Sequence, residues 1–273
     1  MAAISLLGIP HDEYSSHIRG PAAAPAMIRQ QMLDGITTRW SESGIDVQAP
    51  GLIADHGDIL FPAGRDAWEV IETRVAEILG DGAPLLCLGG DHAITHPILR
   101  GIRRHQPKLT ILHIDAHPDI YHAYQGNPRS HTSPFARIME EKLTDRLIQV
   151  GLRTVNDHHR EQFRRFGVET IEAMHCQSMF SGAPLQIDIS TPIYLSVDID
   201  VLDPAFAPGV SHREPGGFST RQVLDIIHAI KQPIVGADIV ELNPHCDMNG
   251  VTTLVAAKIA KEIAGMMVKT NAR

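Results

Sequence analysis

The chain has 273 residues, of which 43% are hydrophobic and 21% charged, proportions that are typical of a globular protein and exclude a largely disordered one. Its formal net charge of -8 offers no basic surface, so we expect no nucleic-acid partner and no anionic membrane surface. The three cysteines are far apart and odd in number, which argues against a disulfide framework and predicts a reducing, cytoplasmic location.

Short apolar runs alternate with longer amphipathic segments, a pattern that indicates βα units around a mainly parallel sheet. The first residues carry no basic leader and predict a strand instead of a signal peptide. No stretch reaches the apolar length of a membrane span. In chain order, strands are predicted over Ile4–Ile9, Pro84–Leu88, Leu109–Ile114, Leu147–Leu152, Val168–Ile171, Ile193–Val197 and Ile234–Val240. Several are apolar throughout, as strands covered on both faces are.

Helical segments lie between these strands, so we predict an α/β fold in which the sheet is the middle layer of an α/β/α sandwich. The predicted helices are Arg65–Leu79, Thr95–His105, Thr220–Ile230 and Thr252–Val268. Two stretches, 10–26 and 201–219, are rich in proline and glycine and too long for simple connections, so we expect functional loops there. With no internal repeat or linker-like segment, we expect one domain over 1–273.

Two motifs with potential metal ligands follow predicted strands, where open α/β sheets collect their functional residues. The first, LLCLGGDHAITH, contains His92, and a histidine after such a turn is on its own more often a capping or core residue. The second, LTILHIDAHPDIY, places Asp115, His117 and Asp119 at alternate positions, so that an extended backbone would point all three the same way. Burying these groups together would be costly without a cation. The earlier His113 is interpreted as a buried histidine with a hydrogen-bond partner.

A third motif, PIYLSVDIDVLDP, places Asp198 and Asp200 on one face at a strand end, whereas Asp203 is more simply a turn residue. If the first two converge with Asp115 and Asp119, the four carboxylates cannot all stay ionised unaided, and two divalent cations would balance them. Carboxylate and imidazole ligands suit hard or borderline ions, and the lack of cysteine among them argues against structural zinc.

A fourth motif, GADIVELNPHCD, offers Asp238 and Glu241 after the last predicted strand. A carboxylate here binds a cationic substrate, supports a metal shell, or caps a helix, and these alternatives stay open. The chain also has 16 histidines, most of which need no functional explanation. His158 and His159, in the polar stretch NDHHREQ, are interpreted in this way.

Together, these motifs resemble the ureohydrolase family of arginases and agmatinases over nearly the whole chain. GGDH, DAHPD, SVDID with DPAFAPG, and VELNP occur in the family's order, and DAHPDIY, FARIME, DPAFAPGVSH and EPGG are similar to plant-type arginases in particular. The resemblance implies an arginase-like three-layer fold, two Mn²⁺ ions per subunit, and a homo-oligomer, either a trimer or a hexamer. It assigns one ion to His92, Asp115, Asp119 and Asp198, and the other to Asp115, His117, Asp198 and Asp200.

The resemblance further implies hydrolysis of a guanidino substrate to urea and an amine, most simply L-arginine to L-ornithine and urea. Glu241 matches the carboxylate that binds the guanidinium group. His131, in PRSHTSPF, matches a histidine beside the substrate that shuttles protons. Asp200 is expected to relay a proton to the leaving amine.

The substrate is less firmly indicated than the reaction. Animal-type arginases have an asparagine where this chain has Tyr121, and an aspartate that contacts the substrate amino group where it has Asn156, but plant-type arginases share both changes. Agmatinases typically have GTGTPEPGG where this chain has GVSHREPGG, which favours arginine. His212 in that loop either contacts the substrate or braces the loop. Agmatine and other guanidino acids remain as alternatives.

Two further interpretations are weaker. A related deacetylase with a single zinc ion shares the broad fold, but the double aspartate of SVDID, together with GGDH and VELNP, argues against it. A non-catalytic assembly protein of the same fold is disfavoured because every expected ligand type is present.

Overall fold

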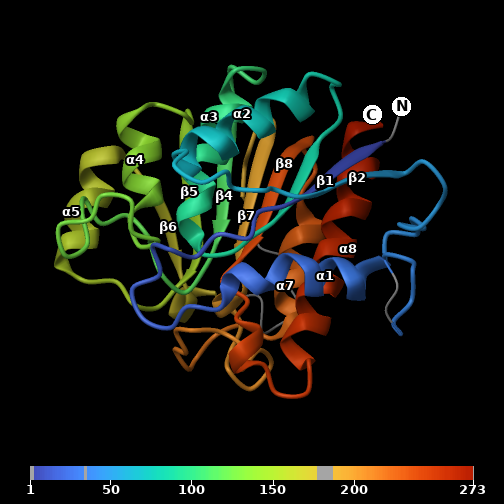
Figure 1. The fold of residues 1–273 in the computed structure, drawn as a ribbon. Coiled ribbons are helices and arrows are strands. Elements are labelled where there is room, and N and C mark those ends of the chain that lie inside the picture. Colours follow the sequence, from blue (N-terminus) through green and yellow to red (C-terminus); the bar gives the residue numbers. More distant parts are fainter. Residues whose placement is uncertain (1–2, 34–35, 177–186, 273) are drawn as a thin grey trace.

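A computed structural model describes residues 3–33, 36–176 and 187–272. Its centre is one sheet of eight strands in the order β2-β1-β3-β8-β7-β4-β5-β6, and every neighbouring pair is parallel (Figure 1). The strands are β1 (Ile4–Gly8), β2 (Ile53–Asp58), β3 (Leu85–Leu88), β4 (Thr110–Ile114), β5 (Arg146–Leu152), β6 (Glu169–Glu172), β7 (Ile193–Asp198) and β8 (Ile234–Val240).

Helices cover both faces of the sheet. They are α1 (Ala24–Leu33), α2 (Ala67–Leu79), α3 (Thr95–Arg103), α4 (Pro134–Glu140), α5 (Asp157–Phe166), α7 (Thr220–Ala229) and α8 (Val251–Asn271). Buried side chains of α1, α7 and α8 form one hydrophobic core with the sheet, and those of α2 to α5 form a second. The predicted three-layer α/β/α sandwich around a parallel sheet is therefore confirmed.

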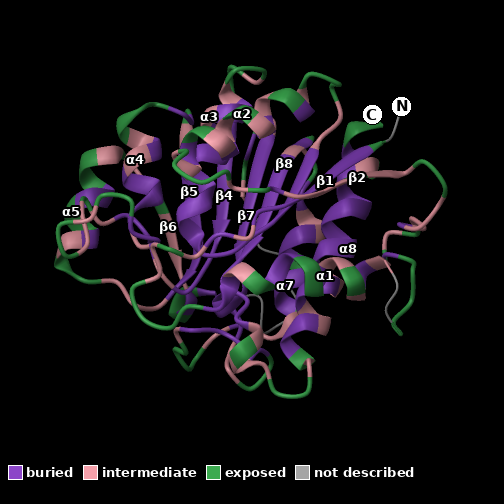
Figure 2. Ribbon diagram, viewed as in Figure 1, coloured by how far each residue is buried: buried purple, intermediate pink, exposed green. Residues whose placement is uncertain are grey.

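The strands supply alternate side chains to the two cores. In β1, Ile4 and Leu6 belong to the core beneath α1, α7 and α8, whereas Leu7 belongs to the core beneath α2 to α5. Burial on both faces explains why most side chains of the central strands are apolar, and Figure 2 shows these strands mostly buried along their length. Among the helices of the described residues, none combines the length and apolar character that a membrane crossing requires.

The predicted strands are all present, with ends that differ by one residue at most, and the four predicted helices correspond to α2, α3, α7 and α8. Among the α-helices and β-strands of the described residues, β2, α1, α4 and α5 were missed. The prediction of an irregular loop over 10–26 was wrong at its end, because a short 3-10 helix begins at Pro21 and α1 at Ala24. No helix or strand lies in 202–219, and Asp203 braces that loop by accepting backbone hydrogen bonds from Ala205, Gly216 and Gly217.

The four motifs follow β3, β4, β7 and β8, which are the four central strands of the sheet. Because these strands are parallel, their carboxyl ends meet at one edge. The topology thus brings together residues that are up to 150 positions apart in sequence, such as His92 and Glu241, whose backbone N–H and carboxylate are hydrogen-bonded at 2.9 Å.

Candidate metal centre

One imidazole nitrogen lies among three carboxylates. The Nδ1 atom of His92 is 3.2 Å from Asp115 Oδ2, 3.0 Å from Asp119 Oδ2 and 3.1 Å from Asp198 Oδ2. All four side chains are buried, and their ligand atoms are close enough to share one ion. The structure thus brings together the four residues that the resemblance assigns to one ion, and their role as metal ligands stays a prediction.

The backbone reaches this geometry in a way that the sequence analysis did not predict. An extended backbone from Asp115 to Asp119 was expected, but β4 ends at Ile114 and the segment beyond it is irregular. Asp119 has a backbone φ of 45°, a left-handed conformation that residues other than glycine rarely adopt. The expectation was wrong because the chain bends at Ala116 and His117, so that strand alternation does not set the direction of Asp119, which lies against His92.

A second group of ligands shares Asp115. His117 Nδ1 lies 2.9 Å from Asp200 Oδ2 and 3.6 Å from Asp115 Oδ1, so the two oxygens of Asp115 face the two groups separately. The side chain of Asp198 offers a ligand atom to the first group only, and its other oxygen, Oδ1, accepts a hydrogen bond from the Asp200 backbone N–H at 2.8 Å. The structure therefore gives Asp115 a bridging geometry, and the bridging role predicted for Asp198 remains a proposal.

The electrostatics of the site demand added positive charge. Burial, together with the nearby carboxylates of Asp200 and Asp115, raises the pKa of Asp198 well above its usual range. Burial opposes the protonation of His92, yet the three surrounding carboxylates raise its pKa well above the ordinary value. The Nδ1 atom of His92 nevertheless has no well-aligned hydrogen-bond partner among the described residues. A divalent cation between these side chains would balance the buried carboxylates and would give His92 Nδ1 a partner. The residues present therefore fit a metal ion.

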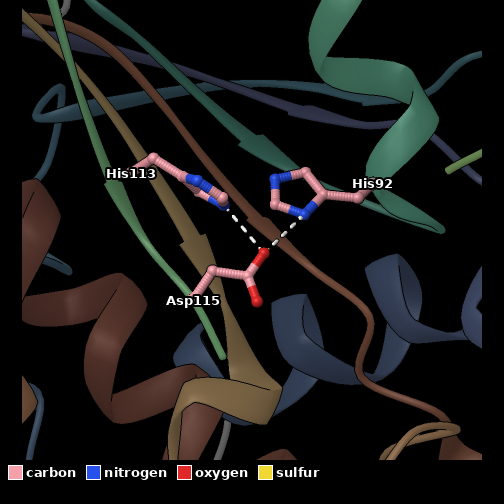
Figure 3. Close-up of side chains that lie close together, drawn as sticks. All are labelled: His92, His113 and Asp115. Carbon is pink, nitrogen blue, oxygen red and sulfur yellow. Dashed lines mark hydrogen bonds and ion pairs between the residues drawn. The ribbon is translucent and has the colours of Figure 1, made fainter. Parts of the chain in front are cut away.

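A second histidine, His113, contacts the carboxylate of Asp115, which the two groups share. His113 Nε2 lies 2.8 Å from Asp115 Oδ2, the same oxygen that faces His92 (Figure 3). The other ring nitrogen, Nδ1, accepts a hydrogen bond from the Gln149 amide at 2.9 Å. His113 is thus a buried histidine with hydrogen-bond partners, as predicted.

Glu241 and His131 form a buried pair beside the two ligand groups. His131 Nδ1 lies 2.8 Å from Glu241 Oε1, which also accepts the His92 backbone N–H. Although burial opposes the charge on His131, Glu241 raises the pKa of His131 to about 9. The far nitrogen, Nε2, is 2.8 Å from the hydroxyl of Ser16, which is exposed to solvent. A buried imidazolium is thus connected to the surface through one hydroxyl group.

These groups open into one cavity of about 160 Å³. It is lined by His117, Pro118, Asp119, Tyr121, His131, Thr132, Thr154, His159, Asp198, Asp200, His212 and Glu241. Asn156 is not among the lining residues: its side chain caps α5 by accepting the His159 N–H and donates to the hydroxyl of Tyr121 at 2.7 Å. The lining does include Tyr121 and His212, both predicted substrate contacts.

His159 is a cavity residue that the sequence analysis dismissed as unremarkable. Its Nδ1 accepts the backbone N–H of Asn156 at 3.3 Å, as part of a capping box at the start of α5. The side chain is only 4% exposed, and its Nε2 has no hydrogen-bond partner among the described residues. Burial lowers the pKa of His159 to about 4, so the ring is neutral. The signal that was available is the spacing from Asn156, which is typical of a helix N-cap.

Comparison with known proteins identifies this architecture. The family model described as the arginase family matches residues 2–265. Arginase 1, mitochondrial, of Arabidopsis thaliana is 42% identical over 98% of this chain and 82% of its own length. A guanidinobutyrase of Pseudomonas aeruginosa is 37% identical over 77% of this chain and 70% of its own. The solved structure of an arginase from Medicago truncatula superposes with a TM-score of 0.89 at 38% identity, covering 97% of this chain and 87% of that one.

The relatives also correct one prediction. A cytoplasmic location was inferred from free cysteines, but several plant arginases similar to this chain carry mitochondrial or chloroplastic locations in their names. The inference failed because unpaired thiols indicate reducing conditions and not a particular compartment.

The metal-binding geometry, the cavity beside it and the family match over nearly the entire length agree with one another. The chain belongs to the arginase family, whose members are metal-dependent hydrolases of linear amidines.

Proposed function

We propose that this chain hydrolyses L-arginine to L-ornithine and urea. The observation that supports it most directly is the Glu241–His131 pair, which shares one cavity with two adjoining groups of metal-binding side chains. Such an arrangement offers a carboxylate to a guanidinium group, a proton donor to a leaving amine, and a place for activated water between them.

We further propose that the site holds two Mn²⁺ ions. His92, Asp115, Asp119 and Asp198 would hold one of them, and Asp115, His117, Asp198 and Asp200 the other. Bound divalent ions supply the Lewis acidity that makes water a nucleophile at neutral pH. Carboxylate and imidazole ligands suit Mn²⁺, although other divalent ions of similar preference compete for such sites.

Glu241 is the group that binds and orients the guanidinium. Its Oε1 is held by two donors, His131 Nδ1 and the His92 backbone N–H, whereas its Oε2 accepts no hydrogen bond from a described residue. The cavity-lining carboxylate can therefore offer Oε2 to the N–H groups of the substrate in a charge-assisted bond. Because the other oxygen is fixed, the substrate carbon is held in one orientation relative to the metal-binding groups.

His131 supplies the proton that the leaving amine needs. Its raised pKa of about 9 keeps the imidazole protonated at neutral pH, and the contact between Nε2 and the exposed Ser16 hydroxyl allows the proton to be replaced from solvent. Asp200, whose pKa is raised to about 6 mainly by burial, is the group that we propose to pass a proton from the attacking water toward the leaving nitrogen.

The outer wall of the cavity favours a substrate whose far end accepts hydrogen bonds. Tyr121, His159 and His212 line it with O–H or N–H groups. All four carboxylates among the described lining residues belong to the metal centre or to the guanidinium site. The far end of arginine carries a carboxylate, which finds donors here and accompanies its own ammonium group, whereas the distal ammonium of agmatine stands alone and finds no separate counter-ion among these residues. The similarity to plant arginases supports the same choice.

A guanidino acid such as 4-guanidinobutyrate is the second candidate, favoured by the similarity to a guanidinobutyrase. Urea release by the Mn²⁺-loaded protein from arginine, agmatine, 4-guanidinobutyrate and guanidine under one set of conditions tests the proposal. A preference for arginine is expected. A preference for agmatine would refute the argument from the outer wall, and no urea from any of them with metal bound would refute the proposed reaction.

The assembly of the protein is also a proposal. We expect 1–273 to act as one domain, because one continuous sheet carries every candidate ligand, and we expect a homotrimer or homohexamer on the basis of the family resemblance. Sedimentation velocity on the purified protein distinguishes these assemblies from a monomer.

A further inference from the structure

Beneath the candidate metal ligands, four polar side chains form a row across the sheet. Asp238 of β8 is in register with Ser196 of β7, Ser196 with His113 of β4, and His113 with Gln149 of β5. We call these four residues the polar row. Each is fully buried, and two of them lie two residues before a proposed ligand: Ser196 before Asp198, and His113 before Asp115. Because strand side chains alternate, the row faces the same side of the sheet as those carboxylates.

One end of the row is hydrogen-bonded to His92. Ser196 Oγ donates to Asp238 Oδ1 at 2.6 Å and lies 2.9 Å from His92 Nε2. A serine hydroxyl has only one hydrogen, and this one goes to the carboxylate, so the oxygen must accept from the Nε2–H of His92. The Nδ1 atom of His92, which faces Asp115, Asp119 and Asp198, is thereby left as the nitrogen that binds a cation.

Asp238 is held rigidly and out of contact with water. Its Oδ2 accepts hydrogen bonds from the Thr95 hydroxyl at 2.7 Å and the Tyr194 hydroxyl at 2.5 Å. The ring of Phe135 covers the neighbouring histidines, with centroids 4.1 Å from His113 and 5.4 Å from His92. In such a dry environment a hydrogen bond to a carboxylate is stronger than in water, and its influence passes along the chain of bonds.

We propose that Asp238, acting through Ser196, is a positioning residue that orients His92 for the metal ion and strengthens its Nδ1 as a ligand. The carboxylate does not touch the ion or the substrate. It fixes which nitrogen of the imidazole carries hydrogen and holds the ring at one angle, as outer partners of metal-binding histidines do. The inference rests on the proposal that His92 binds a metal, but it does not depend on which guanidino compound is hydrolysed.

The other end of the row holds Asp115 in the same manner. The Gln149 amide donates to His113 Nδ1 at 2.9 Å and to the Pro118 carbonyl at 2.6 Å, which leaves His113 Nε2 to donate to Asp115 Oδ2. The row therefore orients two proposed ligands. Ser196 accepts a hydrogen bond from the imidazole of His92, and His113 donates one to the carboxylate of Asp115.

Metal affinity in matched variants of the full chain tests the proposal. Ser196→Ala breaks the connection and Asp238→Asn removes the charge while keeping the shape. Ser133→Ala is the control, because Ser133 is equally buried and close to the site, yet its hydroxyl has no hydrogen-bond partner among the described residues. Mn²⁺ binding to the chelator-treated protein is measured by isothermal titration calorimetry, and thermal unfolding of each variant confirms folding.

We expect Ser196→Ala and Asp238→Asn each to weaken Mn²⁺ binding about 10- to 100-fold, and Ser133→Ala to leave it unchanged. Both substitutions act through the hydrogen bond between Ser196 and His92. The double variant should therefore bind Mn²⁺ no more weakly than the weaker-binding single variant. Urea release by the variants should recover when excess Mn²⁺ is supplied.

Other outcomes would overturn the proposal. Wild-type affinity in folded Ser196→Ala or Asp238→Asn, an equal loss in Ser133→Ala, or additive losses in the double variant would each show that the row does not act through His92. If Ser196→Ala does not fold, the isosteric Asp238→Asn decides alone. If the wild type binds no Mn²⁺, it is instead the proposed metal site that fails.

Discussion

Replacing Asp115 or Asp198 with asparagine should change the stability of the metal-free protein in opposite directions. Asp115 accepts hydrogen bonds from the His117 backbone N–H and from His113 Nε2. Burial opposes its ionisation, yet the imidazoles of His113, His117 and His92 hold its pKa well below the usual range. Asp198 lies against the carboxylates of Asp115 and Asp200, which together with burial raise its pKa. In the metal-free protein at pH 7, the charge of Asp115 therefore stabilises the fold, whereas that of Asp198 destabilises it.

Asp198→Asn should then stabilise the metal-free protein at pH 7, by about 1 kcal/mol or more, because it removes a buried charge that Asp115 and Asp200 repel, an effect that outweighs the loss of its contact with His92. Asp115→Asn should destabilise it by about 1–3 kcal/mol, since its amide N–H₂ group faces one of the two donors. Saturating Mn²⁺ at 100 times the dissociation constant adds about 2.7 kcal/mol to the stability of the wild type. Both variants should lose most of that gain, and urea release with it.

Urea-denaturation curves of chelator-treated and Mn²⁺-loaded protein measure these differences. The advantage of Asp198→Asn should vanish below about pH 4, where an aspartate is protonated in the folded and the unfolded chain alike. The reasoning is refuted if metal-free Asp198→Asn is less stable than the wild type. Full activity in Asp198→Asn would also exclude its role as a ligand.

Three other predictions follow from buried titratable groups. His131→Asn should bind Mn²⁺ like the wild type but lower kcat about 10²-fold or more, which metal analysis and steady-state kinetics measure. The kcat of the wild type should fall as the pH rises through about 9, where His131 loses its proton, and a pH–rate profile checks this. His96 has its pKa lowered to about 4, mainly by burial, so stability should be lost as the pH falls below 6.5, by about 3 kcal/mol at pH 4; a shallower slope is expected in denaturation of His96→Gln. Glu262 is buried and accepts hydrogen bonds from Lys258 and His228, so Glu262→Gln should lower the free energy of unfolding by about 1–3 kcal/mol while Mn²⁺ affinity, measured calorimetrically, stays unchanged.

The sheet was predictable from sequence wherever strands are buried on both faces, because most residues of such strands are apolar. The edge strand β2 was missed because it reads IADHGD and is only half-buried, so neither an apolar run nor a clean alternation marks it. Helix α5 was missed for a similar reason, since DHHREQFRRF buries only three of its side chains. Its one reliable signal is the capping box formed by Asn156 and His159.

The ligands of the site could be predicted because their residue types stand out at the ends of apolar strands. Their exact approach could not, because it depends on left-handed backbone at Asp119 and Glu241, with φ of 45° and 66°, which no local pattern in the sequence requires. The link from His131 to Ser16 joins positions 115 residues apart through one hydroxyl group. Contacts of that kind become visible only when the loop before Pro21 is placed in space.

The polar row has a consequence for how this sequence can change over time. Each member completes the hydrogen bonding of a neighbour on the next strand, so replacing one of them leaves a buried donor or acceptor unpaired, at a cost of about 1–3 kcal/mol. A change at Ser196 is therefore tolerated only together with changes at Asp238 or at the imidazole of His92. Segments that are distant along the chain are constrained to vary as a set. Lineages with a different metal preference should accordingly differ from this one at several row positions at once.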